Sequence, residues 1–125
     1  MMHTNQDDVP MPEDVARLVR RYRDLLVRWP EEGLGAARPE VAGILLHRSY
    51  DIRDVLRQSE EGRRAIGALM RDDVEAVRLA AATDVLEWDP VAAEPVLEEI
   101  ATGGRLALTA EVTLQLFRDG EFDVD

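Results

Sequence analysis

The feature that most constrains the fold of this chain is the spacing of its apolar residues. Between residues 12 and 120, hydrophobic side chains recur three or four positions apart, which is the period of one face of an α-helix. No segment shows the strict two-residue alternation of a half-buried β-strand. The sequence therefore predicts an all-α fold of about six helices, over 12–29, 39–58, 60–71, 73–87, Pro90 to the Gly103–Gly104 pair, and Leu106 to Gly120.

Residues with strong preferences for helix ends mark these boundaries. Ser59 and Asp89 are good N-caps, because their side-chain oxygens can accept a hydrogen bond from the first turn, and Pro90 follows Asp89 where proline is tolerated. Pro30 is expected to end the first helix. Pro95 lies beyond the first turn of a helix that starts at Pro90, so either this helix kinks or its start is delayed.

The short connections between the helices predict that neighbours are antiparallel. A chain of 125 residues that is 46% hydrophobic can build one compact domain, with no room for a second. We expect residues 12–58 to form an N-terminal helical hairpin, which is either a degenerate repeat or a separate cap. Residues 60–120 are expected to form two further hairpins, with 1–11 and 121–125 as flexible tails.

Two segments in the second half of the chain are related. RLAAATDV at 78–85 and RLALTAEV at 105–112 match at arginine, leucine, alanine and valine, with an offset of 27 residues. The longer segment DDVEAVRLAAATDVL resembles a HEAT repeat, with Asp72 in the turn and Val77 and Arg78 in the second helix. The resemblance implies an α-α superhelix, or HEAT-like solenoid, in which these three residues are structural. The second copy departs from the pattern, because Gly104 precedes its arginine and Glu99 replaces the aspartate.

The stretch 61–120 is also similar to a family of small uncharacterised bacterial helical proteins with such repeats. That resemblance implies a bacterial protein and supplies no activity. All 15 basic residues are arginine, a bias that also suggests a GC-rich bacterial coding sequence.

Charge and composition narrow the classes of function. The net charge is −11, and residues 84–125 hold 11 acids against 2 arginines, whereas residues 1–83 hold 15 against 13. An acidic chain is a poor ligand for phosphate backbones, so the charge argues against nucleic-acid binding, although five arginines on the first helix form a local basic strip. The chain has no cysteine and no apolar run of membrane-spanning length. We expect a soluble cytoplasmic protein without membrane contact.

Few residues are suited to catalysis. The only histidines are His3 and His47, and no nucleophile motif or glycine-rich phosphate loop is present. His47, Asp51 and Asp54 would share one face of the second helix, as a metal site requires, but a surface histidine between acids is far more common. We therefore predict no catalytic residues, no metal and no cofactor. The alternative is an enzymatic domain, small-molecule-binding or metal-dependent, with its site on this helix.

The last helix carries two apolar stripes. One contains Leu106, Ala110, Leu114 and Phe117, and the second contains Leu108, Val112 and Leu116. A terminal helix has a neighbour on one side only, so the second stripe needs a cover. Either the stripe completes the core or is covered by Phe122 and Val124 of the tail, or it binds a partner or a second copy. In the last case it is rimmed by Glu111, Asp119 and Glu121.

The function predicted from these features is protein binding. We expect an interaction or adaptor module that recognises a protein, plausibly a basic one, through Leu108, Glu111, Val112 and Leu116. An immunity-type role, in which the chain neutralises a basic toxin, is one form of this function, and a homo-oligomer is another use of the same surface.

Overall fold

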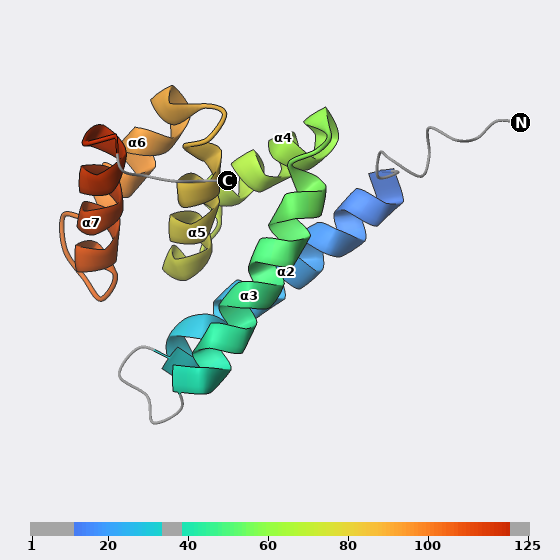
Figure 1. Ribbon diagram of the computed structural model, residues 1–125, viewed down its shortest axis with the longest axis horizontal. Coiled ribbons are helices and arrows are strands. Elements are labelled where there is room, and N and C mark those ends of the chain that lie inside the picture. Colours follow the sequence, from blue (N-terminus) through green and yellow to red (C-terminus); the bar gives the residue numbers. More distant parts are fainter. Residues whose placement is uncertain (1–11, 34–38, 121–125) are drawn as a thin grey trace, which may run out of the picture. The chain divides into compact units, whose positions relative to one another are not determined.

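The computed structural model describes residues 12–33 and 39–120, and these ranges are all-helical, with no strand. They contain six α-helices and one 3₁₀ turn (Figure 1): α2 Pro12–Gly33, α3 Pro39–Leu56, α4 Glu60–Ala68, η1 Leu69–Arg71, α5 Glu75–Val85, α6 Pro90–Ile100 and α7 Ala107–Arg118. The predicted all-α class is confirmed. None of these helices is long and apolar enough to cross a membrane.

Contacts divide the chain into two compact units, Met1–Ala68 (unit 1) and Leu69–Asp125 (unit 2). The boundary falls inside the segment that the sequence predicts as one helix over 60–71. That segment is an α-helix to Ala68 and a 3₁₀ turn from Leu69. The predicted hairpin of 60–71 with 73–87 therefore differs from the observed grouping, in which α4 belongs with α2 and α3.

Unit 1 is an α2–α3 pair with α4 packed against both helices. Its core comes from the apolar stripes read in the sequence, namely Val15, Tyr22, Leu25 and Leu26 of α2, Leu45, Ile52 and Leu56 of α3, and Ile66 of α4. The first helix extends to Gly33 and does not end at Pro30. Proline removes one helix hydrogen bond and crowds the carbonyl four residues earlier, but at Pro30 the helix still continues for three more residues.

The turn from α3 into α4 depends on Ser59 and Gly62. The backbone N–H of Gly62 donates to Ser59 Oγ at 3.0 Å, so Ser59 caps α4 as predicted. Gly62 also lies against the end of α3, because a Cβ atom at this position would stand 1.9 Å from the carbonyl oxygen of Leu56. Only glycine fits this approach.

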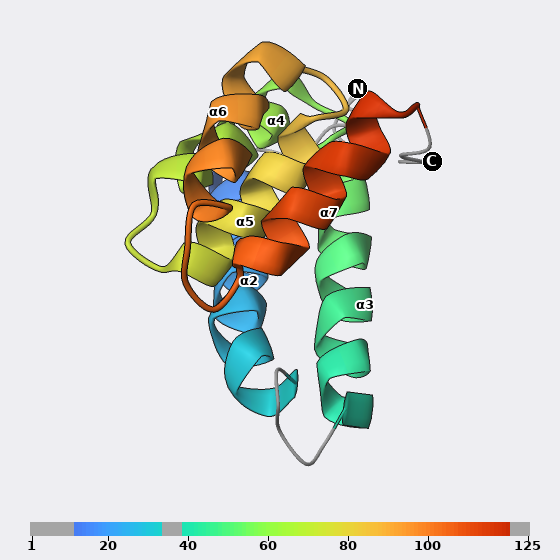
Figure 2. The same cartoon turned by 90° about the vertical axis from the view of Figure 1, so that its left-hand side faces the viewer.

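Unit 2 is built by successive packing: η1 lies against α5, α5 against α6, and α6 against α7. Figure 2 shows these three helices, α5, α6 and α7, in one view. Most residues of α5 are buried, including Val77, Leu79, Ala81, Ala82 and Val85. The small alanine side chains allow neighbouring helices to approach closely.

The residues of the predicted repeat motif lie at the start of α5. Arg78 Nη1 donates to the backbone carbonyls of Asp72 at 2.7 Å and Asp73 at 3.2 Å, and Asp72 Oδ2 accepts from the Val74 N–H at 2.9 Å. Val77 is fully buried. These bonds hold the turn before α5, and Val77 contributes to the core of unit 2.

The start of α6 and the end of α7 lie at the predicted signals, whereas α6 ends at Ile100, before the Gly103–Gly104 pair. Asp89 Oδ1 accepts from the Ala92 N–H at 3.3 Å, and α6 begins at Pro90, so its start is not delayed and Pro95 lies within the helix. After α7, Gly120 has a φ of +77°, a left-handed conformation that favours glycine and ends the helix.

Candidate interaction surface on helix α7

Helix α7 buries one of its two apolar stripes and exposes the other. Leu106, Ala110 and Leu114 are at most 5% exposed. Leu108, Val112 and Leu116 are 70%, 48% and 39% exposed, and we call these three residues the outer row. Isolated exposed apolar residues are normal on proteins, but the outer row occupies consecutive turns of one helix.

The outer row is the stripe of α7 that the described helices leave exposed. Within unit 2, α7 packs against α6, and the stripe of α7 that contains Leu114 is buried. Residues four apart are about 6 Å apart along a helix, so the outer row extends for about 12 Å. It faces away from the buried stripe, since Leu108 and Val112 lie on the opposite side of the helix from Leu106 and Ala110.

The two edges of the outer row differ in chemistry. One edge carries Glu111 and Gln115, and the side chain of Glu111 has no ion-pair or hydrogen-bond partner within the described part of the chain. The other edge carries Thr109 and Thr113, and Thr113 Oγ1 donates to the Thr109 carbonyl at 2.8 Å. We call these the acidic edge and the threonine edge.

The arginine of α7 is already paired. Arg118 Nη2 lies 2.6 Å from Glu98 Oε2 of α6, which links the two helices on that side. At the end of the outer row, Gln115 Nε2 donates to the carboxylate of Asp119 at 3.1 and 3.2 Å. Glu121, Phe122 and Val124, which the sequence analysis places near this surface, lie outside the described residues.

The excess negative charge of the protein belongs to the unit that carries this surface. Residues 69–125 contain 14 acids and 4 arginines, a net charge of −10, whereas residues 1–68 contain 12 acids and 11 arginines, a net charge of −1. The sequence showed a C-terminal excess. The structure shows that it coincides with a separate compact unit.

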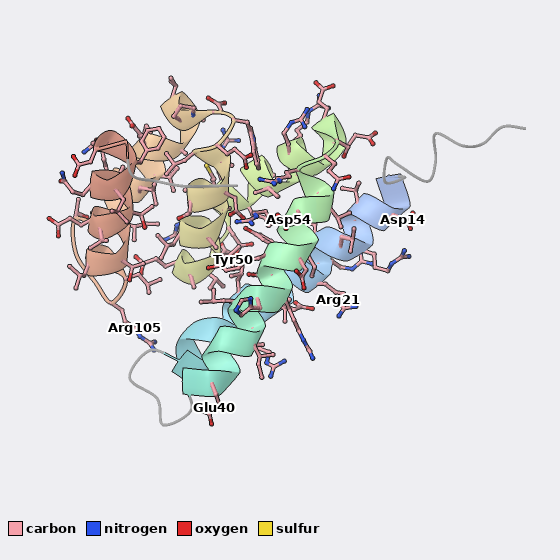
Figure 3. All side chains as sticks on the ribbon, in the orientation of Figure 1. Asp14, Arg21, Glu40, Tyr50, Asp54 and Arg105 are labelled. Atoms are coloured by element: carbon pink, nitrogen blue, oxygen red, sulfur yellow. The ribbon has the colours of Figure 1, made fainter. Side chains whose placement is uncertain are left out.

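The rival site on α3 has a different arrangement. His47 and Asp51 are exposed, and Asp54 Oδ1 accepts from Arg53 Nη2 at 3.0 Å and Nε at 3.2 Å, with Arg57 Nε at 3.7 Å. Figure 3 labels Asp54 and Tyr50 on this helix. Over the residues that the structure describes, no group of three or more His, Asp or Glu side chains could hold a metal ion.

Tyr50 forms a small aromatic cluster on α3 that the sequence reasoning did not anticipate. The guanidinium carbon of Arg53 lies 5.0 Å from the centre of the Tyr50 ring, and the His47 ring lies edge-on to it at 6.2 Å. The i, i+3 spacing of these residues was the available signal. Residue spacing was also the available signal for the threonine edge, because Thr109 and Thr113 are four positions apart.

Comparisons with known proteins add a structural neighbour and no family. No family model matches the chain, and no curated protein matches it. The structure is similar to the crystal structure of the protein RPA1889 from Rhodopseudomonas palustris CGA009, with a TM-score of 0.79 and 27% sequence identity. The match covers 89% of this chain and 93% of that protein, so it includes residues of both units. It is a likeness to a bacterial protein, and no HEAT-type family is shown.

Proposed function

We propose that this protein is a protein-binding module and that the outer row of α7 receives a basic partner protein. The observation that supports this proposal is the contrast between the two stripes of α7: Leu114 is 5% exposed, whereas Leu108 is 70% exposed. The sequence of α7 supplies apolar side chains on two faces, and the fold uses only one of them.

The outer row is large enough to contribute to association. Its three exposed fractions together equal about one and a half fully exposed side chains. Covering them would contribute about 2–5 kcal/mol at about 1.5–3 kcal/mol per side chain. That corresponds to roughly one to three orders of magnitude in Kd, before the entropic cost of association.

The charge of unit 2 supports a basic partner. A net charge of −10 on residues 69–125 attracts cationic proteins and repels nucleic acid. Neutralisation of a basic toxin by an immunity-type protein would use such a surface. A HEAT-type arrangement of α5, α6 and α7 is part of the same proposal, supported by their successive packing and by the related segments at 78–85 and 105–112.

Affinity capture with three baits tests the proposal. The baits are the unaltered protein, Leu116→Glu in the outer row, and Val91→Glu on α6, which places the same charge at an isolated, 84% exposed apolar residue of the same unit. Circular dichroism should show that all three are folded. Quantitative mass spectrometry should identify a basic protein that the unaltered and Val91→Glu baits retain and that Leu116→Glu loses.

Two results would contradict the proposal. One is a set of captured proteins that is the same for all three baits. The other is light scattering that gives a dimer for the unaltered protein and a monomer for Leu116→Glu, because a second copy would then cover the outer row. An activity or metal affinity abolished by His47→Ala would instead support the rival site on α3.

A further inference from the structure

We infer that the element of the partner that binds α7 is an amphipathic α-helix whose arginines or lysines lie over Glu111. This inference rests on the proposed function and specifies its partner. The supporting observations are the outer row, the difference between its two edges, and the charge of unit 2.

A helix is favoured because α7 offers only side chains for binding. Its backbone groups are bonded within the helix, so an extended segment could not add to it as a strand adds to a sheet edge. An extended segment laid on the outer row would also place its own N–H and C=O groups against apolar side chains without partners. A helix brings its backbone hydrogen bonds with it.

A related segment of the same chain shows what such a face can pack against. In the alignment of 78–85 with 105–112, Val85 corresponds to Val112 and Ala81 to Leu108. Val85 and Ala81 are 2% and 0% exposed, in a unit whose described elements are all helices and turns. The face that is open on α7 is therefore related to one that is buried in an all-helical environment on α5.

The outer row also matches the spacing of a helix. Its residues lie at i, i+4 and i+8, which forms a ridge of about 12 Å. A partner helix that presents apolar residues at i, i+3 or i+4, and i+7 would place them in the grooves beside this ridge.

The two edges give the partner helix a preferred side for its charges. Glu111 lies on the acidic edge without a partner in the described part of the chain, and the arginine of the same helix, Arg118, is paired with Glu98. The threonine edge has no charge. Basic side chains of the partner should therefore lie on the Glu111 side, where a charge-assisted hydrogen bond can form.

A second copy of this chain fits the surface less well than a basic helix. In an antiparallel pair of α7 helices related by a two-fold axis, equivalent edges meet, so Glu111 would face Glu111 of the other copy. Whether the two α7 helices are parallel or antiparallel, two units with a net charge of −10 would be brought together. Charge thus selects against the pair of identical copies and for a basic partner.

Synthetic peptides provide a defined probe. The first peptide has leucines at i, i+4, i+7 and i+11, arginines along one flank, and alanine and glutamine elsewhere. The second replaces two central alanines with proline to prevent a helix, and the third replaces the arginines with glutamates. Binding is measured by fluorescence anisotropy, the peptide's helix formation by circular dichroism, and the contacted residues by NMR of this 14.0 kDa protein.

We expect only the first peptide to bind strongly and to become helical on binding. Val112→Glu should weaken its binding by about tenfold or more. Glu111→Arg should weaken it by about tenfold and Glu111→Gln by about threefold, because the charge-assisted bond is lost or reversed. Thr109→Arg, the matched change on the threonine edge, should alter binding by less than about twofold.

The outcomes separate this inference from the proposed function. If the proline peptide binds as well as the first, and Val112→Glu abolishes the binding of both peptides, the inference of a helical partner is wrong and the proposed function stands. If Thr109→Arg and Glu111→Arg weaken binding equally, or if the glutamate peptide binds as tightly as the first peptide, the inferred placement of basic residues over Glu111 is wrong. If the first peptide binds and Val112→Glu has no effect, the proposed function itself fails. Absence of binding at millimolar peptide overturns the inference.

Discussion

Truncating one leucine from each stripe of α7 measures directly which stripe belongs to the core. Leu114 is 5% exposed, and Leu→Ala at buried sites lowers stability by about 2–5 kcal/mol. The opposite face of α7 is exposed, so the cavity can partly collapse, and we expect a loss of about 2–3 kcal/mol. Leu108 is 70% exposed, so less than about 1 kcal/mol of burial is lost on truncation. Alanine's helix propensity offsets part of that loss.

The two variants should therefore differ by about 2 kcal/mol in their free energy of unfolding, and this difference should be measured in unit 2. The chain contains two tryptophans, Trp29 in unit 1 and Trp88 in unit 2. In a Trp29→Phe background, Trp88 fluorescence reports the unfolding of unit 2 in urea. With a slope of about 1–3 kcal/mol per molar urea, Leu114→Ala should lower the midpoint by about 1 M, whereas Leu108→Ala should leave it nearly unchanged.

Equal losses of stability for Leu108→Ala and Leu114→Ala would refute this reasoning. The outer row would then be packed in the free protein, as expected if Phe122 and Val124 cover it, and would not be available to a partner. A small loss for both variants would mean that α7 contributes little to the fold of unit 2.

The turn between α3 and α4 supplies two further predictions, each with a matched control. Gly62→Ala should destabilise unit 1 by about 3 kcal/mol, because its Cβ would meet backbone atoms of Leu56 that no rotamer change can move away; Gly67→Ala in the same helix, with nothing within 4 Å of its Cβ, should stabilise it by about 0.5–1 kcal/mol. Ser59→Ala should lower stability by about 0.5–2 kcal/mol through loss of the N-cap bond to Gly62, whereas Ser59→Thr, which keeps the acceptor oxygen, should lose less. Urea unfolding followed by circular dichroism measures all four, and equal stabilities within either pair would contradict the reasoning.

The local part of the fold could be predicted from the sequence because helix signals are local. Apolar residues three or four apart placed the helices, and the caps at Ser59 and Asp89 are where the sequence puts them. Pro30 was misjudged, since the loss of one hydrogen bond does not end a helix that continues to Gly33. The requirement for glycine at 62 depends on where the end of α3 lies, and residue spacing does not contain that information.

The grouping of the helices could not be read from the sequence. The segment 60–71 changes from α-helix to 3₁₀ turn after Ala68, and its two parts belong to different units. Short connections predict that sequential helices are neighbours, but they do not say which pair is packed more closely. The related segments also start at different points of their helices, because Arg78 lies within α5 and Arg105 lies before α7. The two segments are therefore similar in sequence but occupy different positions along their helices.

The sequence also does not show which apolar faces are buried, because both α5 and α7 have apolar residues on two faces. On α5 the second stripe, Leu79, Ala82 and Leu86, is at most 3% exposed, whereas on α7 the outer row is at least 39% exposed. The two stripes have similar composition, so hydrophobicity alone does not distinguish a core face from a binding face. What distinguishes them is the number of neighbours around each helix, which is set by tertiary packing. The outer row is thus an apolar face that no described helix covers, and this exposure is the physical basis of the proposal that it binds a partner.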